Sequence, residues 1–320
     1  MAPLAGLLVV DLSRYLPGAF ATRELRRLGA RVVRLEPPGG DPMRDTAPAW
    51  HDALNAGAES VVCDLKAEPE LGRALAARAD VFVESFRPGV AERLGIGPAD
   101  LPDTIVYCSI TGFGTHGPHA RRAGHDLNYL GWAGVLADSA PALPPVQVAD
   151  LAAGALGAVT EILAALLERE RTGSGSHVVV SMTHGSHRLA AHRLRGDPLP
   201  RLLTGGLASY GIYATADARL LTVGALEPKF FGRLCELLGL TELAERQYDA
   251  AAQGDIARAL AGAFAERPLD EWLELFDGDD VCVGPVATLE EAAGEFAVPA
   301  ADRAPRLGEH TERWKDELRV

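Results

Sequence analysis

Hydrophobic residues fall in short, regularly spaced runs over the first 180 residues of the chain. Five of these runs are rich in Val and Ile and are bounded by turn residues, which is typical of buried strands. They span residues 8–10, 31–35, 81–83, 105–107 and 177–180. Helical patterns lie between them, for example at residues 19–28 and 69–78. This alternation predicts an α/β fold with a mostly parallel sheet, whose ligands bind at the carboxyl ends of the strands.

The pattern changes after about residue 196. Residues 209–213 and 220–224 flank Asp217 and predict an antiparallel hairpin. Helical patterns follow at residues 229–238, 255–266 and 269–276. We therefore predict a large α/β domain over residues 1–195, completed by residues 295–320, and a smaller α+β domain over residues 196–294. Because residues 297–320 are polar and contain Pro and Arg, they suggest a surface extension or arm.

Composition narrows the classes of function. The chain has 320 residues, 48% of them hydrophobic, which is enough to bury one large core or a large and a small one. Its formal net charge of −13 argues against binding of nucleic acid or an anionic membrane, although a few arginines can still hold a small anion. The longest apolar stretch, residues 148–167, includes Asp150 and Glu161, so a core helix fits better than a membrane span.

Two further observations concern location and metals. No export signal is evident at the N-terminus, which makes the cytoplasm the expected location. The four cysteines are far apart and show no spacing typical of metal ligands, so free thiols are expected.

The segment Gly124-His125-Asp126 precedes a predicted helix at residues 127–136. A helix N-terminus offers unpaired N–H groups that stabilise an oxygen as it becomes negative, and His125 could act there as a base. The alternative is that Asp126 caps the helix and that His125 is an ordinary histidine. A three-residue signal of this kind does not separate the two interpretations.

Two isolated carboxylates are further candidates for acid–base chemistry. Asp150 comes just before a segment rich in Ala and Gly, where it is either a first-turn residue favoured by the helix dipole or a partly buried base or nucleophile. Glu227 ends the second hairpin strand beside Pro228, which fits either a site or a simple helix entry. Removal and return of a proton at one carbon requires two groups of this kind.

Two loops that follow predicted strands could contact a ligand. Residues 112–118 are glycine-rich but lack the features of a P-loop or a dinucleotide fingerprint, so they either cradle a ligand or form a turn. Arg87 follows the strand at residues 81–83, where its guanidinium could meet a phosphate or lie in solvent.

Taken together, these segments resemble the class III CoA-transferase family (CaiB/BaiF type), which includes α-methylacyl-CoA racemase. The matching segments run in one order over nearly the whole chain, at residues 10–13, 28–37, 64–66, 84–90, 111–114, 123–129, 171–173 and 305–311. The racemase branch is the more similar one, because transferases usually have another residue at the position of His125. The resemblance implies a Rossmann-like large domain, a smaller α+β domain and an interlocked homodimer.

The resemblance also implies an activity, that of an acyl-CoA racemase or epimerase that transfers a proton at the α-carbon of a 2-methylacyl thioester through an enolate. His125 and Asp150 would be the two bases, and Glu227 would orient His125 of the partner chain. Coenzyme A would enter as part of the substrate, and neither a separate cofactor nor a metal is expected. The residues implied to contact the thioester and its CoA are Arg34, Asp64, Leu65, Lys66, Arg87, Gly112, Gly114, Gly124, Asp126, Leu127, Asn128 and Tyr129.

The chain departs from the racemase pattern where positive charge is expected near the CoA phosphates. Pro37 stands in place of a common arginine, and residues 56–59, Ala-Gly-Ala-Glu, lack three basic side chains. This predicts weaker binding of the nucleotide end, with Arg34, Lys66 and Arg87 left to carry it.

Three alternatives to a racemase acting on free CoA thioesters therefore stay open. One is a racemase that acts on a carrier-protein phosphopantetheine thioester. A second is an acyl-CoA:carboxylate CoA-transferase that uses Asp150 as its nucleophile. The third is a non-catalytic binding protein that has kept the fold.

Overall fold

The computed structural model describes residues 2–196, 203–296 and 303–320. The chain divides into two compact units, one formed by Met1–Ala191 and Ala300–Val320 and the other by His192–Pro299. We call them the large unit and the small unit and describe each by itself. The sequence analysis placed the corresponding boundaries between residues 195 and 196 and between residues 294 and 295.

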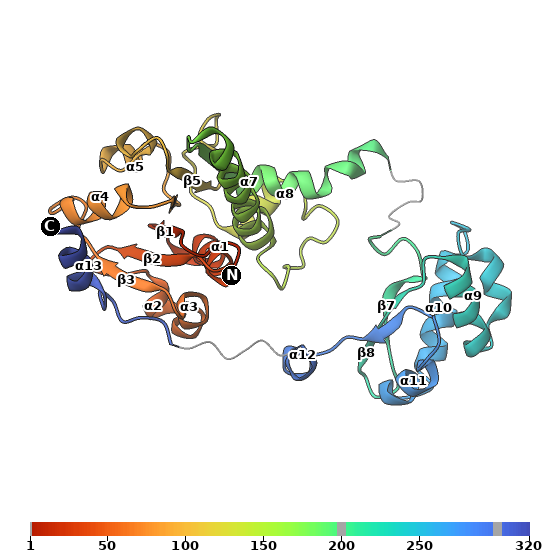
Figure 1. Ribbon diagram of the computed structural model, residues 1–320. Helices are drawn as coiled ribbons and strands as arrows, with labels where there is room; N and C mark the ends of the chain where they lie inside the picture. Colours follow the sequence, from red (N-terminus) through yellow and green to blue (C-terminus); the bar gives the residue numbers. More distant parts are fainter. Residues whose placement is uncertain (1, 197–202, 297–302) are drawn as a thin grey trace. The chain divides into compact units, whose positions relative to one another are not determined.

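The large unit is built on a six-stranded sheet in the order β3-β2-β1-β4-β5-β6, in which every pairing is parallel (Figure 1). Its strands are β1 (Leu8–Asp11), β2 (Arg31–Glu36), β3 (Glu59–Val62), β4 (Val81–Glu84), β5 (Val106–Thr111) and β6 (His177–Ser181). The predicted α/β fold with a mostly parallel sheet is confirmed. The strand order reverses direction between β1 and β4, and open α/β sheets bind ligands at such a reversal.

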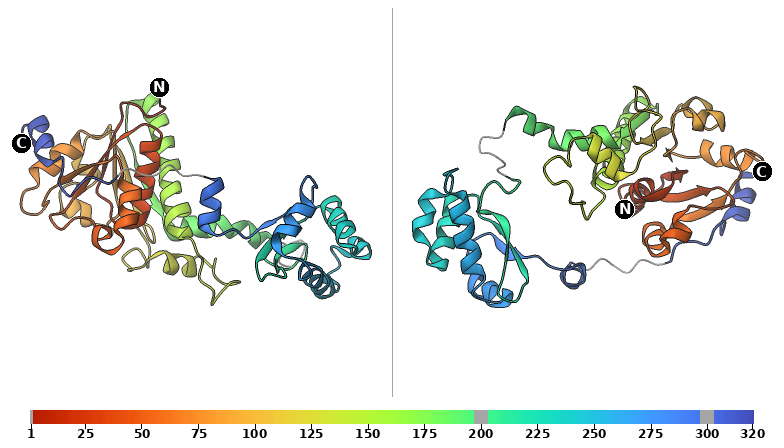
Figure 2. Two further views of the ribbon diagram at one scale, coloured as in Figure 1. Left: turned by 90° about the horizontal axis from the view of Figure 1, so that it is seen from below. Right: turned by 180° about the vertical axis from the view of Figure 1, so that it is seen from behind.

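Helices lie on both faces of this sheet (Figure 2). They are α1 (Tyr15–Arg27), α2 (Met43–Thr46), α3 (Pro48–Asn55), α4 (Glu70–Ala77), α5 (Val90–Arg93), α6 (Asp126–Trp132), the π-helix η2 (Ala149–Leu156), α7 (Gly157–Thr172), α8 (Met182–Ala190) and α13 (Thr311–Leu318). Alternate strand residues enter different cores, as expected for a strand buried on both sides. Val9 and Val32 belong to the core under α1 and α7, whereas Val10 and Val33 belong to the core that contains Trp314.

One helical run in the described residues, Ala149–Thr172, is long and apolar enough to cross a membrane by length and composition alone. A core helix of a soluble protein passes the same test. Here Ala158, Ile162 and Leu166 are buried in the same core as Val106 of β5. One face of the run therefore packs in the core, whereas Leu156 and Leu167 are exposed.

The expectation of a surface arm at residues 297–320 is wrong for its described part. Trp314 of α13 is fully buried, and its Nε1 donates a hydrogen bond of 2.7 Å to Oε2 of Glu59. The Arg31 guanidinium lies 4.4 Å from the centre of the Trp314 ring. The Trp314 indole, together with hydrogen bonds from Gly308 and His310 to Ser60, thus anchors a polar helix beside β3. The sequence analysis also missed β3, because only two of its four residues are apolar.

The small unit has an antiparallel sheet in the order β7-β8-β9. Its elements are β7 (Tyr210–Ala214), β8 (Leu220–Gly224), α9 (Pro228–Leu238), α10 (Gln253–Phe264), α11 (Leu269–Phe276), β9 (Val283–Pro285) and α12 (Leu289–Glu295). The predicted hairpin is present, and β9 extends it to three strands. Phe231, Phe264 and Trp272 form the centre of a separate core.

Candidate active site

A cavity of about 480 Å³ at the carboxyl edge of the large unit's sheet brings His125 and Asp150 together. We call it the catalytic cavity. Loops from three strands contribute to its wall, including Arg14 after β1, Arg87 after β4 and Gly112 after β5. Residues separated widely in sequence meet here because parallel strands all end at the same edge.

His125 stands immediately before α6, which begins at Asp126, one residue earlier than predicted. Its backbone is extended, with φ at −128°. Its backbone N–H donates a hydrogen bond of 3.0 Å to Oδ1 of Asn128, and its carbonyl accepts from the Asn128 N–H at 2.8 Å. Both bonds involve the main chain, so the backbone is fixed while the exposed imidazole faces the catalytic cavity. The Tyr15 ring meets it edge-on, with 6.1 Å between ring centres.

Asp150 lies in the first turn of the π-helix η2, opposite the start of α6. Its backbone N–H donates a hydrogen bond of 2.9 Å to Oδ1 of Asp126, which ties the two elements together. Burial raises the pKa of the Asp150 carboxyl to about 7, and the neighbouring Asp126 carboxylate adds to this rise. A carboxyl with this pKa exchanges its proton readily near neutral pH, as a catalytic acid or base must.

Tyr129 braces the wall of the catalytic cavity. Its side chain is buried, and its hydroxyl donates a hydrogen bond to the Gly124 carbonyl. A Cβ atom at Gly112 would lie 2.5 Å from Cε1 of Tyr129, and one at Gly124 would lie 2.8 Å from it. Glycine is therefore required at both positions for the ring to approach. Burial, with the Asp150 charge in second place, raises the pKa of Tyr129 to about 12, so its hydroxyl keeps its proton as a donor.

The remaining predicted contacts near α6 divide into separate groups. Asn128 lines the catalytic cavity, and Asp126 reaches it through its bond to Asp150. Gly114 lines a neighbouring cavity of about 390 Å³. Leu127 lines neither of these cavities, and its side chain is 45% exposed.

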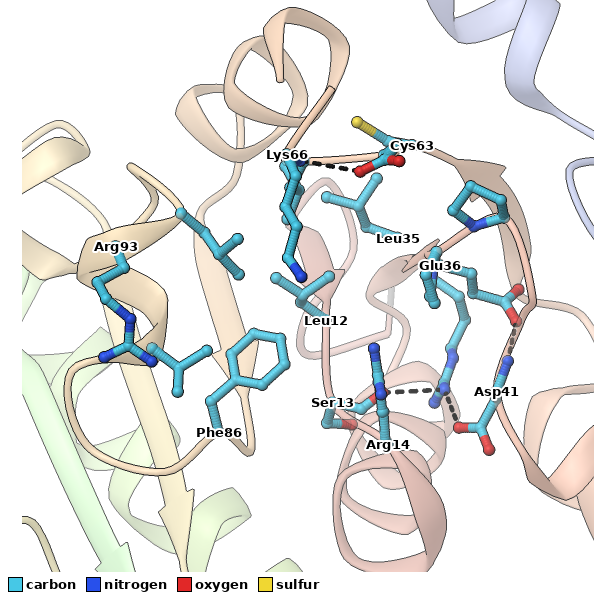
Figure 3. Close-up of a pocket in the computed structure, with 17 residues that line it drawn as sticks. Leu12, Ser13, Arg14, Leu35, Glu36, Asp41, Cys63, Lys66, Phe86 and Arg93 are labelled. Atoms are coloured by element: carbon cyan, nitrogen blue, oxygen red, sulfur yellow. Dashed lines mark hydrogen bonds and ion pairs between the residues drawn. The ribbon is translucent and has the colours of Figure 1, made fainter. Parts of the chain in front are cut away.

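A second cavity, of about 670 Å³, opens beside β1, β2 and β4 (Figure 3). We call it the basic cavity, because Arg14, Lys66 and Arg93 line it together with apolar side chains such as Phe86. Leu65 and Asp64 also line it. Arg14 and Phe86 border the catalytic cavity as well, so the two cavities share a wall.

Asp64 and Arg34 shape the basic cavity. Oδ1 of Asp64 accepts a hydrogen bond of 2.9 Å from the backbone N–H of Lys66, which fixes the turn that carries the lysine. Arg34 is only 2% exposed and pairs with Asp11 at 3.0 Å and with Asp41 at 2.8 Å. Its charge is thus balanced inside the protein, and Arg14 and Arg93, which the sequence analysis did not name, are the more accessible cations.

Glu227 belongs to the small unit, where it precedes α9. Its carbonyl accepts hydrogen bonds from the N–H groups of Phe230 and Phe231 at 3.0 and 3.1 Å, and its side chain is exposed. The buried Gln247 side chain donates to the Leu226 carbonyl at 2.7 Å and holds the turn just before the glutamate. No pattern in the sequence singled out Gln247, which lies far from Glu227 along the chain.

The strand order is that of a Rossmann-like fold with two cavities at the carboxyl edge of its sheet. Residues 4–311 match CoA-transferase family III, and the chain belongs to that family. Among its relatives, alpha-methylacyl-CoA racemase from Homo sapiens is 35% identical, with 98% of this chain and 93% of the relative covered. Succinyl-CoA:glutarate CoA-transferase from Mus musculus is 32% identical over 93% of this chain and 75% of its own.

Solved structures agree with this assignment. The crystal structure of Rv3272 from Mycobacterium tuberculosis superposes with a TM-score of 0.85 at 28% identity, covering 98% of this chain and 99% of that one. A CaiB/BaiF family protein from Brucella suis gives a TM-score of 0.83 at 29% identity, covering 99% of both chains. The predicted family is confirmed, and the family contains both racemases and CoA-transferases.

Proposed function

We propose that the protein is an acyl-CoA racemase or epimerase that inverts the α-carbon of a 2-methylacyl thioester. The observation that carries the proposal is the pair formed by His125 and Asp150 on one cavity, in which burial brings the pKa of Asp150 to about 7. The match to alpha-methylacyl-CoA racemase over nearly the full length of both chains supports it.

The chemistry uses the two groups in turn. In one direction the His125 imidazole removes the α-proton, and the C–H electron pair becomes the C=C bond of an enolate with its negative charge on the thioester oxygen. Protonated Asp150 then donates its proton to the opposite face of that carbon. The reverse direction begins with ionised Asp150 and protonated His125, and exchange of both protons with solvent resets the enzyme.

Stabilisation of the enolate oxygen is assigned to the start of α6. The first N–H groups of a helix have no partner within it, and the first one here belongs to Asp126, the residue after His125, which lines the catalytic cavity. The Asp126 side chain is turned to the Asp150 N–H and so does not supply this stabilisation. Preorganised donors of this kind commonly contribute the largest share of the rate enhancement when an oxyanion develops.

The CoA portion of the substrate is assigned to the basic cavity. Arg14, Lys66 and Arg93 supply positive charge there, and the apolar side chains of Phe86 and Leu94 can cover the adenine or the pantetheine arm. Because Arg14 and Phe86 also border the catalytic cavity, a CoA thioester bound in the basic cavity could extend its acyl end toward His125 and Asp150.

The test is incubation with each enantiomer of a 2-methylacyl-CoA in deuterated water. Deuterium at the α-carbon together with loss of optical activity is expected. Asp150→Asn and His125→Ala should each abolish racemisation yet keep slow exchange of opposite enantiomers, because one base remains on one face. His116→Ala is the matched control, since His116 lies outside the catalytic cavity. Absence of exchange in the unmodified protein would overturn the proposal.

A CoA-transferase is the second candidate. The catalytic cavity contains a partly buried carboxylate, Asp150, that could form an acyl anhydride, and transferases are among the relatives. Transfer needs neither His125 nor Glu227, which favours the racemase. Movement of the acyl group to a free carboxylate, without exchange at the α-carbon, would establish the transferase instead. If both assays fail, a phosphopantetheine thioester on a carrier protein is the next substrate to try, and a non-catalytic role follows if that fails too.

The dimer is also a proposal. The resemblance to the family implies that two chains interlock and that Glu227 of one chain acts beside His125 of the other. A carboxylate beside the imidazole would orient it and stabilise its protonated form. Sedimentation of the unmodified protein should give twice the mass of the chain, and a monomer would exclude this arrangement.

A further inference from the structure

The catalytic cavity has an excess of positive charge for a site that handles a neutral acyl group. Arg14, Arg87 and Arg122 line it, whereas Asp150 is the carboxylate on its wall. All three arginines are exposed, and none forms an ion pair with the described part of the chain. This local charge stands against a formal net charge of −13 for the whole chain, so it does not follow from an overall excess of basic residues.

The three arginines have different neighbours. Arg14 also lines the basic cavity, and Arg87 also lines a cavity of about 340 Å³ beneath the loop after β4. Arg122 lines the catalytic cavity but not the basic one. Of the three arginines, Arg122 is therefore the one whose position is least accounted for by binding of the CoA phosphates.

Arg122 is held in a manner that leaves its donors available. Its guanidinium carbon lies 5.5 Å from the centre of the Trp132 ring on α6. Trp132 is itself fixed by His119, whose ring centre is 4.3 Å away. A guanidinium that stacks on an aromatic face keeps its N–H groups in the plane of the group, free to bind a carboxylate through two parallel hydrogen bonds.

We propose that Arg122 recognises a carboxylate on the acyl group, so that the preferred substrate is the thioester of a dicarboxylic acid rather than of a neutral fatty acid. This inference rests on the proposed function and names its substrate class. Arg122 precedes His125 by three residues in the same loop, which places an anion-binding group close to the carbon that reacts. A substrate carboxylate would otherwise repel the enolate as it forms, and the Arg122 charge offsets that repulsion.

The experiment compares two thioesters of similar shape and different charge. In 2-methylsuccinyl-CoA, esterified beside the methyl branch, the acyl group ends in a carboxylate, and in 2,4-dimethylpentanoyl-CoA an isopropyl group replaces it. The readouts are kcat/KM for α-proton exchange and the dissociation constant from calorimetry. The unmodified protein should prefer the carboxylate, and Arg122→Met should lower that preference about 10- to 100-fold, as expected for hydrogen bonds to a charged group. Arg122→Lys should fall between them, because lysine keeps the charge and loses the paired donors.

Arg121→Met is the matched control, because Arg121 is the adjacent exposed arginine and lines a different cavity. It should keep the preference of the unmodified protein. An equal loss for both thioesters in Arg122→Met, or the same change in Arg121→Met, would overturn the inference and assign Arg122 to the CoA phosphates or to folding. If neither thioester exchanges but calorimetry still shows an Arg122-dependent preference for the carboxylate, the proposed function fails and the inference stands. Without such a preference in binding or exchange, the inference fails.

Discussion

The chemistry of Asp150 comes from what surrounds it rather than from the residue alone. The Asp150 carboxyl is partly buried and lies near the Asp126 carboxylate. In the described part of the chain, no basic side chain forms an ion pair with it. The neutral form of the carboxyl is therefore favoured. An acid that must both give and accept a proton needs this balance, and the folded chain maintains it at some cost to its own stability.

The raised pKa of Asp150 predicts how the stability of the folded protein depends on pH. The folded protein holds a proton on Asp150 up to about pH 7, whereas the unfolded chain releases it near 3.8. The native state thus binds more protons between these values, so the Asp150 contribution to stability falls as the pH rises from about 4 to 7. Asp150→Asn lacks this titration and should be more stable than the unmodified protein at pH 8, on the order of 1–3 kcal/mol, with little difference at pH 4. Urea unfolding at both pH values measures it, and an equal difference at the two would contradict the assignment.

Tyr129 and its glycines show how much of the site lies beyond sequence patterns. The segment at residues 123–129 was sufficient to name His125 and Asp126 as candidates, but not to show that Asp126 binds the Asp150 N–H. That contact joins residues 24 positions apart, and no local pattern encodes it. Likewise the sequence suggests Arg34 as a phosphate ligand because it is an arginine. Only the fold shows that Asp11 and Asp41 already neutralise its charge.

A substitution at the Tyr129 contact tests the cavity wall. Gly112→Ala places a Cβ atom 2.5 Å from the Tyr129 ring and should destabilise the large unit by ~1–3 kcal/mol. Activity should fall with it as the ring is displaced. Gly131→Ala, in α6 with open space around the added methyl, should be neutral or slightly stabilising. Thermal unfolding of both variants compares them, and similar melting temperatures would refute this account of Gly112.

At the scale of elements, sequence patterns located the apolar strands and amphipathic helices and missed two elements with few apolar residues. Five strands of the large sheet and the hairpin of the small unit follow from apolar runs. Only two of the four residues of β3 are apolar, and α13 is polar over most of its surface. Trp314 links the two elements, together with hydrogen bonds between Ser60 and His310, and these contacts exist only once the sheet edge is packed.

Removal of that indole should therefore affect two elements together. Trp314→Ala leaves a large cavity and deprives Glu59 of a donor, so a loss of ~3–5 kcal/mol in the free energy of unfolding is expected. The control is Trp50→Ala, because the Trp50 side chain is 58% exposed. Hydrogen exchange should show faster exchange at β3 and α13 in Trp314→Ala before the rest of the sheet, and uniform protection would show that α13 is not anchored in this way.

At the scale of the whole molecule, the proposed dimer predicts that two inactive variants can restore activity when they form a mixed dimer. His125→Ala and Glu227→Ala should each be nearly inactive, and co-expression of the two should restore activity. About a quarter of the unmodified rate is expected, because half of the randomly assembled dimers are mixed and each mixed dimer has one intact site. Separately purified and mixed variants serve as the control, since interlocked chains exchange slowly. No recovery after co-expression would place both residues in the site of one chain.

The wall that the basic and catalytic cavities share, formed by Arg14 and Phe86, has a consequence for how the proposed enzyme would use its substrate. A ligand gripped at its nucleotide end would be anchored against the same side chains that border the reacting carbon. Binding energy from the nucleotide end could then serve to orient the α-hydrogen toward its base rather than to bind the thioester more tightly. Truncated thioesters that keep the acyl group and lose the nucleotide should accordingly have a low kcat even at saturation. The nucleotide part of CoA would then contribute to catalysis as well as to binding.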